Sequence, residues 1–236
     1  VELEGTIAST KELANALDND RNGYIADVEG WNTINGTPVV TDCQGHGTAL
    51  AKILVSKTGV SPLAKIIPIR VLDCKGNGTA LSVANGLVYA IIRGADIAEL
   101  PFSGVGASTL LADVVRYAKA SGMLVVGAAG NDSTPISRVF PANVSGVLSV
   151  GATTSNGKGL ATYTNTGALV NAPGAALGVS FEGTSVSSTY VAGTAALALM
   201  KNSALTLKAL EAKLIPIPSV INPKNPKVLD ALKAVQ

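Results

Sequence analysis

A single histidine is the first residue in this chain whose type and setting suit chemistry. His46 is the only histidine among the 236 residues, and it lies in the sequence GHGT, before a run of small and apolar residues. Flanking glycines followed by a helix-forming run predict an imidazole at the start of a helix. A lone histidine in a loop fits the residue type equally well, whereas a histidine held at a helix start can act as a general base.

A serine near the C-terminal end is the second candidate. Ser185 follows Gly183 and Thr184 and begins another run rich in small residues. A helix N-cap, or a serine that is merely tolerated there, would explain the residue. Alternatively, Ser185 is a nucleophile whose developing negative charge is stabilised by first-turn N–H groups and the helix dipole. Only the fold could bring Ser185 and His46 together.

An asparagine between them is the third candidate. Asn131 ends the sequence AAGN and follows an apolar stretch that reads as a strand. An asparagine beside a glycine is common in turns. In the functional interpretation, its side-chain amide donates a hydrogen bond to an oxyanion.

Taken in order, these three motifs resemble those of the subtilisin-like serine peptidase (subtilase) family. The matching stretches are GHGT (45–48), AAGN (128–131) and GTSVSSTYVAGTAAL (183–197), with further agreement at 66–79, 140–153 and 172–174. The resemblance implies a serine endopeptidase in which Ser185 attacks the scissile carbonyl and His46 carries the proton. It also implies that Asn131 and the Ser185 N–H hold the oxyanion.

The family's third catalytic residue, a carboxylate that orients the histidine, has no clear counterpart. The nearest match is VELEG at residues 1–5, where strict spacing puts Leu3 at the acid position and a shift of one residue puts Glu4 there. The acid is therefore lost, replaced by Glu4, or supplied from outside the chain. Pro101 and Phe102 also depart from the family pattern, in the segment that lines the substrate cleft.

Two other function classes compete with an active peptidase. The alternative is a catalytically impaired relative that acts as a binding or structural module, and a carboxylate within reach of His46 would distinguish the two. A nucleotide-binding α/β domain is suggested only by Gly104 and Gly106, which make an incomplete fingerprint.

A polar loop near the N-terminus predicts a structural calcium site. The sequence DNDRNG at 18–23 alternates oxygen-bearing side chains and ends in a glycine that permits a sharp turn, as calcium loops do. A polar turn without metal gives the same pattern. The candidate ligands are Asp18, Asp20, Asn22, Asp27 and Glu29.

The chain has two cysteines, Cys43 and Cys74, which are either paired or reduced. Composition alone favours buried thiols, because the core is large enough to need no disulfide. The family resemblance instead implies a Cys43–Cys74 disulfide, since some bacterial members carry paired cysteines at these two places. A disulfide would mean an oxidising compartment.

The elements that must position these residues alternate between strand and helix. Apolar runs at 65–72, 96–102, 123–128 and 147–152 read as strands, and helical periodicity marks 83–91, 110–118, 185–200 and 205–214. Near-continuous apolar strands alternating with helices predict a three-layer α/β fold, with a mostly parallel sheet between two layers of helices. We expect one domain over residues 1–236, with the site at the carboxyl ends of the strands.

Composition narrows the partners. Hydrophobic residues make up 47% and charged residues 14%, the net charge is +2, and no basic stripe suggests nucleic acid. The longest apolar stretch, 191–200, is too short to span a bilayer, and no signal peptide is visible. We expect a secreted or periplasmic monomer with no membrane partner, a polypeptide substrate, and a propeptide or upstream segment as a further partner.

Overall fold

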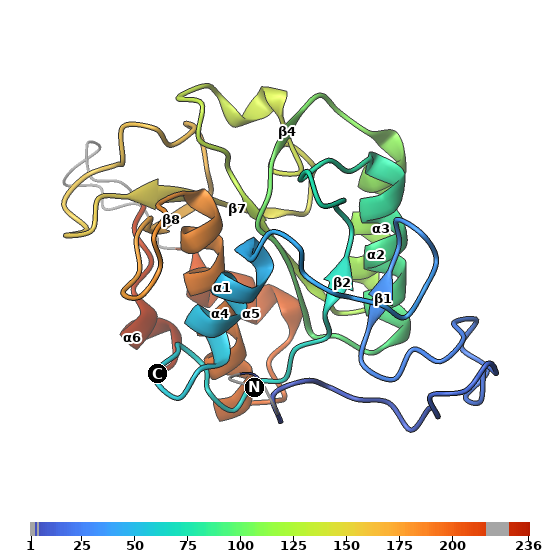
Figure 1. The fold of residues 1–236 in the computed structure, drawn as a ribbon. Helices are drawn as coiled ribbons and strands as arrows, with labels where there is room; N and C mark the ends of the chain where they lie inside the picture. The colour runs from blue at the N-terminus through green and yellow to red at the C-terminus, as the bar shows by residue number, and fades with distance from the viewer. Residues whose placement is uncertain (1–2, 4, 216–226) are drawn as a thin grey trace.

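The computed structural model describes residues 3, 5–215 and 227–236 of the chain. A parallel four-stranded sheet forms its centre, in the strand order β3-β5-β7-β8, of which β7 and β8 are labelled in Figure 1. These strands are β3 (Ile97–Leu100), β5 (Leu124–Ala128), β7 (Leu148–Thr153) and β8 (Val170–Pro173).

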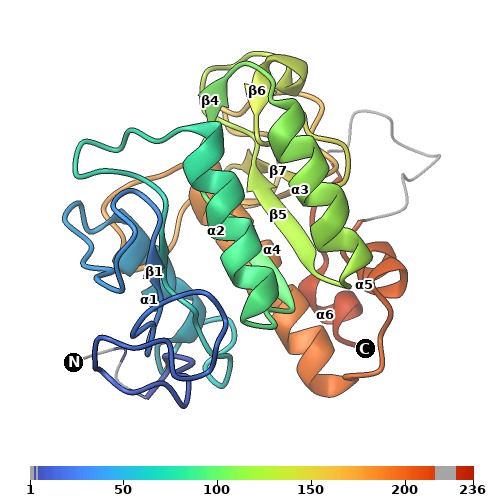
Figure 2. The ribbon, with the colours of Figure 1, turned by 90° about the vertical axis from the view of Figure 1, so that its right-hand side faces the viewer.

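Two layers of helices cover this sheet. On one face, α2 (Ala80–Ile92) and α3 (Thr109–Ala120) pack against alternate strand residues such as Ala98, Leu100 and Val125. On the other face lie α4 (Thr184–Lys201), α5 (Leu207–Leu214) and α6 (Ala231–Ala234), which pack against Leu124 and Val126 (Figure 2). The three-layer, mostly parallel α/β fold predicted from the sequence is therefore confirmed.

Two small sheets and one more helix complete the described elements. The pair β1 (Trp31–Asn32) and β2 (Ile69–Arg70) is parallel, whereas β4 (Gly104–Val105) and β6 (Val139–Phe140) pair antiparallel next to the short 3₁₀ helix η1 (Ile136–Arg138). Helix α1 (His46–Val55) packs against α4, which brings the predicted histidine and serine motifs together.

The second strand is shorter than predicted. Residues 65–72 read as one strand, but only Ile69 and Arg70 pair as β2, and Ile66 makes an isolated parallel bridge to Ile7. Pro68 separates the two pairings, and proline has no N–H to donate to a ladder. The apolar residues of this stretch therefore do not mark strand pairing over its whole length, and none of residues 65–72 is fully buried.

A cavity separates β2 from β3. Its volume is about 870 Å³, and residues from both strands line it, together with residues of α1, α2 and α4. His46 and Glu99 are among the lining residues. The site predicted from the sequence therefore adjoins a large hollow that is partly open to solvent.

Candidate active site

The predicted histidine and serine meet at the starts of two helices. His46 is the first residue of α1 and Ser185 the second residue of α4, and His46 Nε2 lies 3.3 Å from Ser185 Oγ. Ser185 is buried, and the His46 ring is partly covered by Phe181, whose ring centroid is 5.2 Å away. Burial lowers the pKa of His46, so the imidazole is neutral near pH 7 and can accept a proton.

The loop that carries His46 is shaped by a carboxylate that the sequence analysis missed. Asp42 accepts hydrogen bonds from the N–H groups of Gln44, Gly45 and Thr48 and from the Thr48 hydroxyl, at 2.7 to 3.0 Å. These bonds outweigh desolvation and lower the pKa of Asp42 to about 2. Its negative charge also raises the pKa of His46 slightly against the effect of burial. An aspartate just before a glycine and a helix-forming run is the signal that could have revealed it.

Gly45 is needed for the turn into α1. Its φ is +80°, in the left-handed region that residues with a Cβ rarely adopt. The backbone can therefore reverse between Asp42 and His46 and present the imidazole toward α4.

Asn131 lies beside the start of α4. Its Oδ1 accepts hydrogen bonds from the Thr184 N–H at 2.9 Å and from the Thr184 hydroxyl at 3.0 Å. The amide orientation is thereby fixed, and no acceptor for Nδ2 is found among the described residues. The neighbouring Gly130 has φ +95°, and a Cβ there would lie 2.4 Å from Asn165 Nδ2, so this turn also requires glycine.

Neither sequence candidate for the third catalytic residue contacts the imidazole in the part of the chain that the structure describes. Leu3 lines the same cavity as His46, but its side chain cannot accept a hydrogen bond. Glu4 lies outside the described residues. Within residues 3, 5–215 and 227–236, no carboxylate is bonded to His46 Nδ1.

Comparison with known proteins agrees with this geometry. The model of the subtilase family matches residues 4–216. The chain belongs to the subtilase family. Subtilisin DY of Bacillus licheniformis is 34% identical over 206 residues, which cover 79% of this chain and 75% of that protein. Thermitase of Thermoactinomyces vulgaris is 33% identical over 187 residues, which cover 72% of this chain and 66% of thermitase.

Solved structures give the same assignment. A cold-adapted subtilisin-like serine proteinase superposes with a TM-score of 0.76 at 29% identity, covering 85% of this chain and 79% of the other. The family, the subtilisin-like fold and the enzyme class of a serine endopeptidase, all expected from the sequence motifs, are confirmed.

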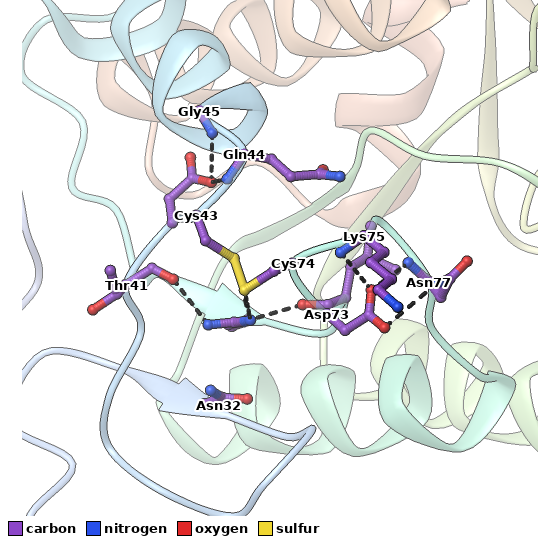
Figure 3. Close-up of a disulfide and its surroundings, with 12 residues drawn as sticks. Asn32, Thr41, Cys43, Gln44, Gly45, Asp73, Cys74, Lys75 and Asn77 are labelled. Carbon is purple, nitrogen blue, oxygen red and sulfur yellow. Dashed lines mark hydrogen bonds between the residues drawn. A yellow bond between two sulfur atoms is a disulfide. The ribbon is translucent and has the colours of Figure 1, made fainter.

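In this subtilase, a disulfide lies next to the histidine loop. Cys43 and Cys74 are bonded, with Cα atoms 5.4 Å apart, and join the loop before α1 to the turn after β2 (Figure 3). Arg70 supports both segments, because its guanidinium donates to the Thr41 carbonyl and contacts both sulfurs. The preference for reduced thiols from composition is wrong for this structure, and the pairing implied by the family resemblance is present.

The calcium prediction is met in part by the arrangement of acidic residues. Glu12, Asp20 and Asp27 each offer a carboxylate oxygen, and these oxygens lie within 4.8 Å of one another. Two of the carboxyl oxygens, Glu12 Oε2 and Asp27 Oδ1, are buried without a hydrogen-bond partner. Unpartnered buried carboxylate oxygens are costly, and a hard divalent cation would satisfy them.

Of the other predicted ligands, Asn22 contacts this acidic group, whereas Asp18 and Glu29 are not part of it. Asp18 accepts hydrogen bonds from the N–H groups of Asn22 and Gly23, and the Asn22 amide donates to Asp20 and Asp27. Glu29 lies outside the cluster. Glu12 was missed because it precedes the DNDRNG loop, and only the fold returns it to Asp27.

Another missed residue is Glu99, a carboxyl on the central strand β3. Its Oε1 accepts hydrogen bonds from the hydroxyls of Ser188 and Thr189 on α4. Burial raises the pKa of Glu99 to about 7. No motif marks this glutamate, because its partners lie about ninety positions along the chain.

Proposed function

We propose that Ser185 and His46 are the nucleophile and the general base of this endopeptidase. The supporting observation is the 3.3 Å approach of His46 Nε2 to Ser185 Oγ, made by residues 139 positions apart. Such an approach between a buried serine at a helix start and a neutral imidazole is the geometry of an activated nucleophile.

The reaction would proceed through an acyl-enzyme. Ser185 Oγ attacks the carbonyl carbon of the scissile peptide bond as His46 Nε2 removes its proton. The oxyanion accepts hydrogen bonds from Asn131 Nδ2 and the Ser185 N–H, whose position in the first turn of α4 gives it no partner within the helix. His46 then protonates the leaving amine, and a water molecule activated by His46 hydrolyses the ester.

A hollow beside β4 supports a polypeptide substrate. Its volume is about 330 Å³, and it is lined by residues of the segments 76–80 and 102–108. Val105, which is 95% exposed, stands at its edge. An extended peptide lying along this edge would place an apolar side chain in the hollow.

A second candidate function, an impaired peptidase that acts as a binding module, is favoured by one observation. His46 Nδ1 has no carboxylate partner among the described residues. In subtilisin, a relative of this chain, loss of the triad aspartate alone lowers turnover by about four orders of magnitude. The peptidase proposal therefore predicts slow acylation unless an acid outside the described residues supports His46.

The test is covalent labelling with a fluorophosphonate in the presence of calcium, with the site read by peptide mass spectrometry. We expect labelling at Ser185, its loss in Ser185→Ala, and a loss of at least about a hundredfold in rate in His46→Ala. Ser155→Ala, which removes an exposed serine in the turn after β7, is the matched control. Absence of labelling on folded protein would refute the peptidase proposal and leave the binding module.

We further propose that Glu12, Asp20 and Asp27 hold a structural Ca²⁺. The ion would supply positive charge to the two unpartnered carboxylate oxygens and tie the N-terminal loop to the core through Asp27, which accepts a hydrogen bond from the Tyr89 hydroxyl. Calcium should raise the melting temperature in a concentration-dependent way, by mass action on the folded state.

Glu12→Gln should weaken this stabilisation, whereas Glu29→Gln, at a predicted ligand outside the cluster, should leave it intact. Calcium titration followed by calorimetry measures both variants. An unchanged melting temperature in the wild type with and without calcium would refute the site.

We also propose that the protein is secreted or periplasmic and monomeric. An exposed disulfide supports an oxidising compartment. Among the described residues, no helix is long and apolar enough to cross a membrane. Fractionation of producing cells, followed by sizing chromatography of the active fraction, tests both statements.

A further inference from the structure

Glu99 occupies an unusual position for a carboxyl group. Side chains of β3 alternate between the two faces of the sheet, so Ala98 and Leu100 pack toward α2 and α3 while Ile97 and Glu99 face α4. Ile97 packs in the apolar layer on that side, and Glu99 instead meets the first turns of the helix that carries Ser185. It retains accessible surface because it lines the cavity between β2 and β3.

Two hydroxyl groups connect Glu99 to the residue proposed as nucleophile. Ser188 Oγ lies 2.8 Å and Thr189 Oγ1 3.1 Å from Glu99 Oε1. The same two oxygens each lie 2.9 Å from the backbone carbonyl oxygen of Ser185. Each hydroxyl has only one hydrogen, so it can donate either to Glu99 or to the Ser185 carbonyl at any moment.

We propose that Glu99 is a positioning residue for Ser185, and that its protonation state decides which of these two acceptors the Ser188 and Thr189 hydroxyls serve. An ionised Glu99 attracts both hydrogens, since a carboxylate is the stronger acceptor. A protonated Glu99 releases them to the Ser185 carbonyl. Hydroxyls that donate to carbonyls three and four residues earlier tend to bend a helix, which would move Ser185 Oγ relative to His46. This inference rests on the proposed role of Ser185.

The surroundings of Glu99 place its ionisation near neutral pH. Burial raises the pKa of Glu99 to about 7, and the two hydroxyls act in the opposite direction. Val126, its partner on the neighbouring strand β5, is apolar. The other charged or titratable residues that line the same cavity are Asp42, His46, Lys65, Arg70, Asp73, Arg93 and Asp96. None of them is among the causes of the shift in the pKa of Glu99.

The first test is the pH profile of fluorophosphonate labelling at Ser185. In the wild type, the rate should depend on two ionisations, those of His46 and Glu99. In Glu99→Gln, whose neutral amide stands in for the protonated carboxyl, only the His46 ionisation should remain, and at pH 8.5 the variant should label about fivefold more slowly than the wild type, the effect of one hydrogen bond. The two proteins should label equally at pH 6, where Glu99 of the wild type is largely protonated. The matched control is Asp96→Asn, an exposed carboxylate on the approach to the same strand, which should keep the wild-type profile.

Two threonine variants separate the hydroxyl relay from the charge of Glu99. Thr189→Val removes the hydroxyl that lies between Glu99 and the Ser185 carbonyl, at nearly constant side-chain shape. It should reduce the change in labelling rate that accompanies ionisation of Glu99. Thr189→Ser, which keeps a hydroxyl, should show the wild-type change in rate. The proposal would be overturned if Glu99→Gln kept the wild-type pH profile, or if Thr189→Val kept the full change in labelling rate assigned to ionisation of Glu99.

A second measurement does not depend on peptidase activity. The amide resonance of Val186, whose nitrogen follows the Ser185 carbonyl, should titrate with a midpoint near pH 7 in the wild type, as Glu99 does. The titration should be absent in Glu99→Gln. If labelling fails but this titration is present, the proposed function is refuted, whereas the coupling of Glu99 to Ser185 through the Ser188 and Thr189 hydroxyls is supported. If the titration is also absent in the wild type, the network is refuted.

Discussion

Removal of the disulfide should reduce stability by an amount that follows from the length of the loop it closes. Cys43 and Cys74 are 31 positions apart. Cross-linking a loop of this length lowers the entropy of the unfolded chain by an amount equivalent to about 3.7 kcal/mol at 25 °C. Both cysteines are exposed, and the double variant Cys43→Ser/Cys74→Ser leaves no cavity, so nearly the full loss is expected. Arg70 can donate to the new hydroxyls in place of the sulfurs.

Urea denaturation in saturating calcium measures this effect. The free energy of unfolding should fall by about 3 to 4 kcal/mol, and the dependence on urea should steepen, because an unlinked chain exposes more surface on unfolding. Wild-type protein unfolded in excess dithiothreitol is the control and should match the double variant. A loss below about 1 kcal/mol in both samples would refute the entropic account for this loop.

Three further changes have directions fixed by the structure. Asp42→Asn should lower the free energy of unfolding by about 1 kcal/mol at pH 7, a small amount because solvent screens the exposed carboxylate. This difference should vanish as the pH falls from about 3.8 to about 2, because Asp42 in the folded wild type is then protonated. For Glu99 the pKa is raised, so its ionisation destabilises the fold as the pH rises from about 4.5 to about 7. Glu99→Gln should therefore stabilise by at most about 3 kcal/mol at pH 8 and by little at pH 4.5, in urea titrations at the two pH values. Asn131→Ala should slow acylation of a peptide ester about 10² to 10³-fold, and it should also lower the melting temperature because the buried Thr184 loses the acceptor for its N–H and hydroxyl. An unchanged rate would exclude Asn131 from the oxyanion site.

Local pattern was enough to predict most of the elements. Helix α4 spans Thr184–Lys201 where residues 185–200 were expected, and β7 spans Leu148–Thr153 where 147–152 were expected. These segments are long and apolar, and the residues that their spacing predicts as core-facing are the ones that pack in the core. The stretch at 65–72 was apolar for a different reason, because it lines a cavity and pairs over only two residues in β2.

Contacts between segments that are far apart in the chain could not be predicted from the sequence. Glu99 meets α4 only because β3 lies beneath it, and nothing in the sequence around Glu99 signals a polar partner. Glu12 likewise reaches Asp27 through the path of the N-terminal loop. The motif residues His46, Asn131 and Ser185 could be proposed from the sequence because each stands in its own recognisable motif, which needs no knowledge of the fold.

The third catalytic residue, a carboxylate that is not found beside His46 among the described residues, is expected near the N-terminal segment, so the pairing register of that segment matters. Ile7 is bridged in parallel to Ile66, and the N-terminal segment then turns away, since the Thr10 N–H bonds to the Val28 carbonyl. Parallel strands present their carboxyl ends to the active site, whereas Leu3 precedes this pairing and lies in a turn in which the Thr6 N–H donates to the Leu3 carbonyl.

Two effects act on the pKa of His46. Burial lowers it, and the negative charge of Asp42 raises it by a smaller amount. An imidazolium formed during acylation would therefore receive little stabilisation from the described residues. Under the proposed mechanism, unless a carboxylate outside the described residues supports His46, acylation of Ser185 rather than binding of a polypeptide is the step that should limit turnover.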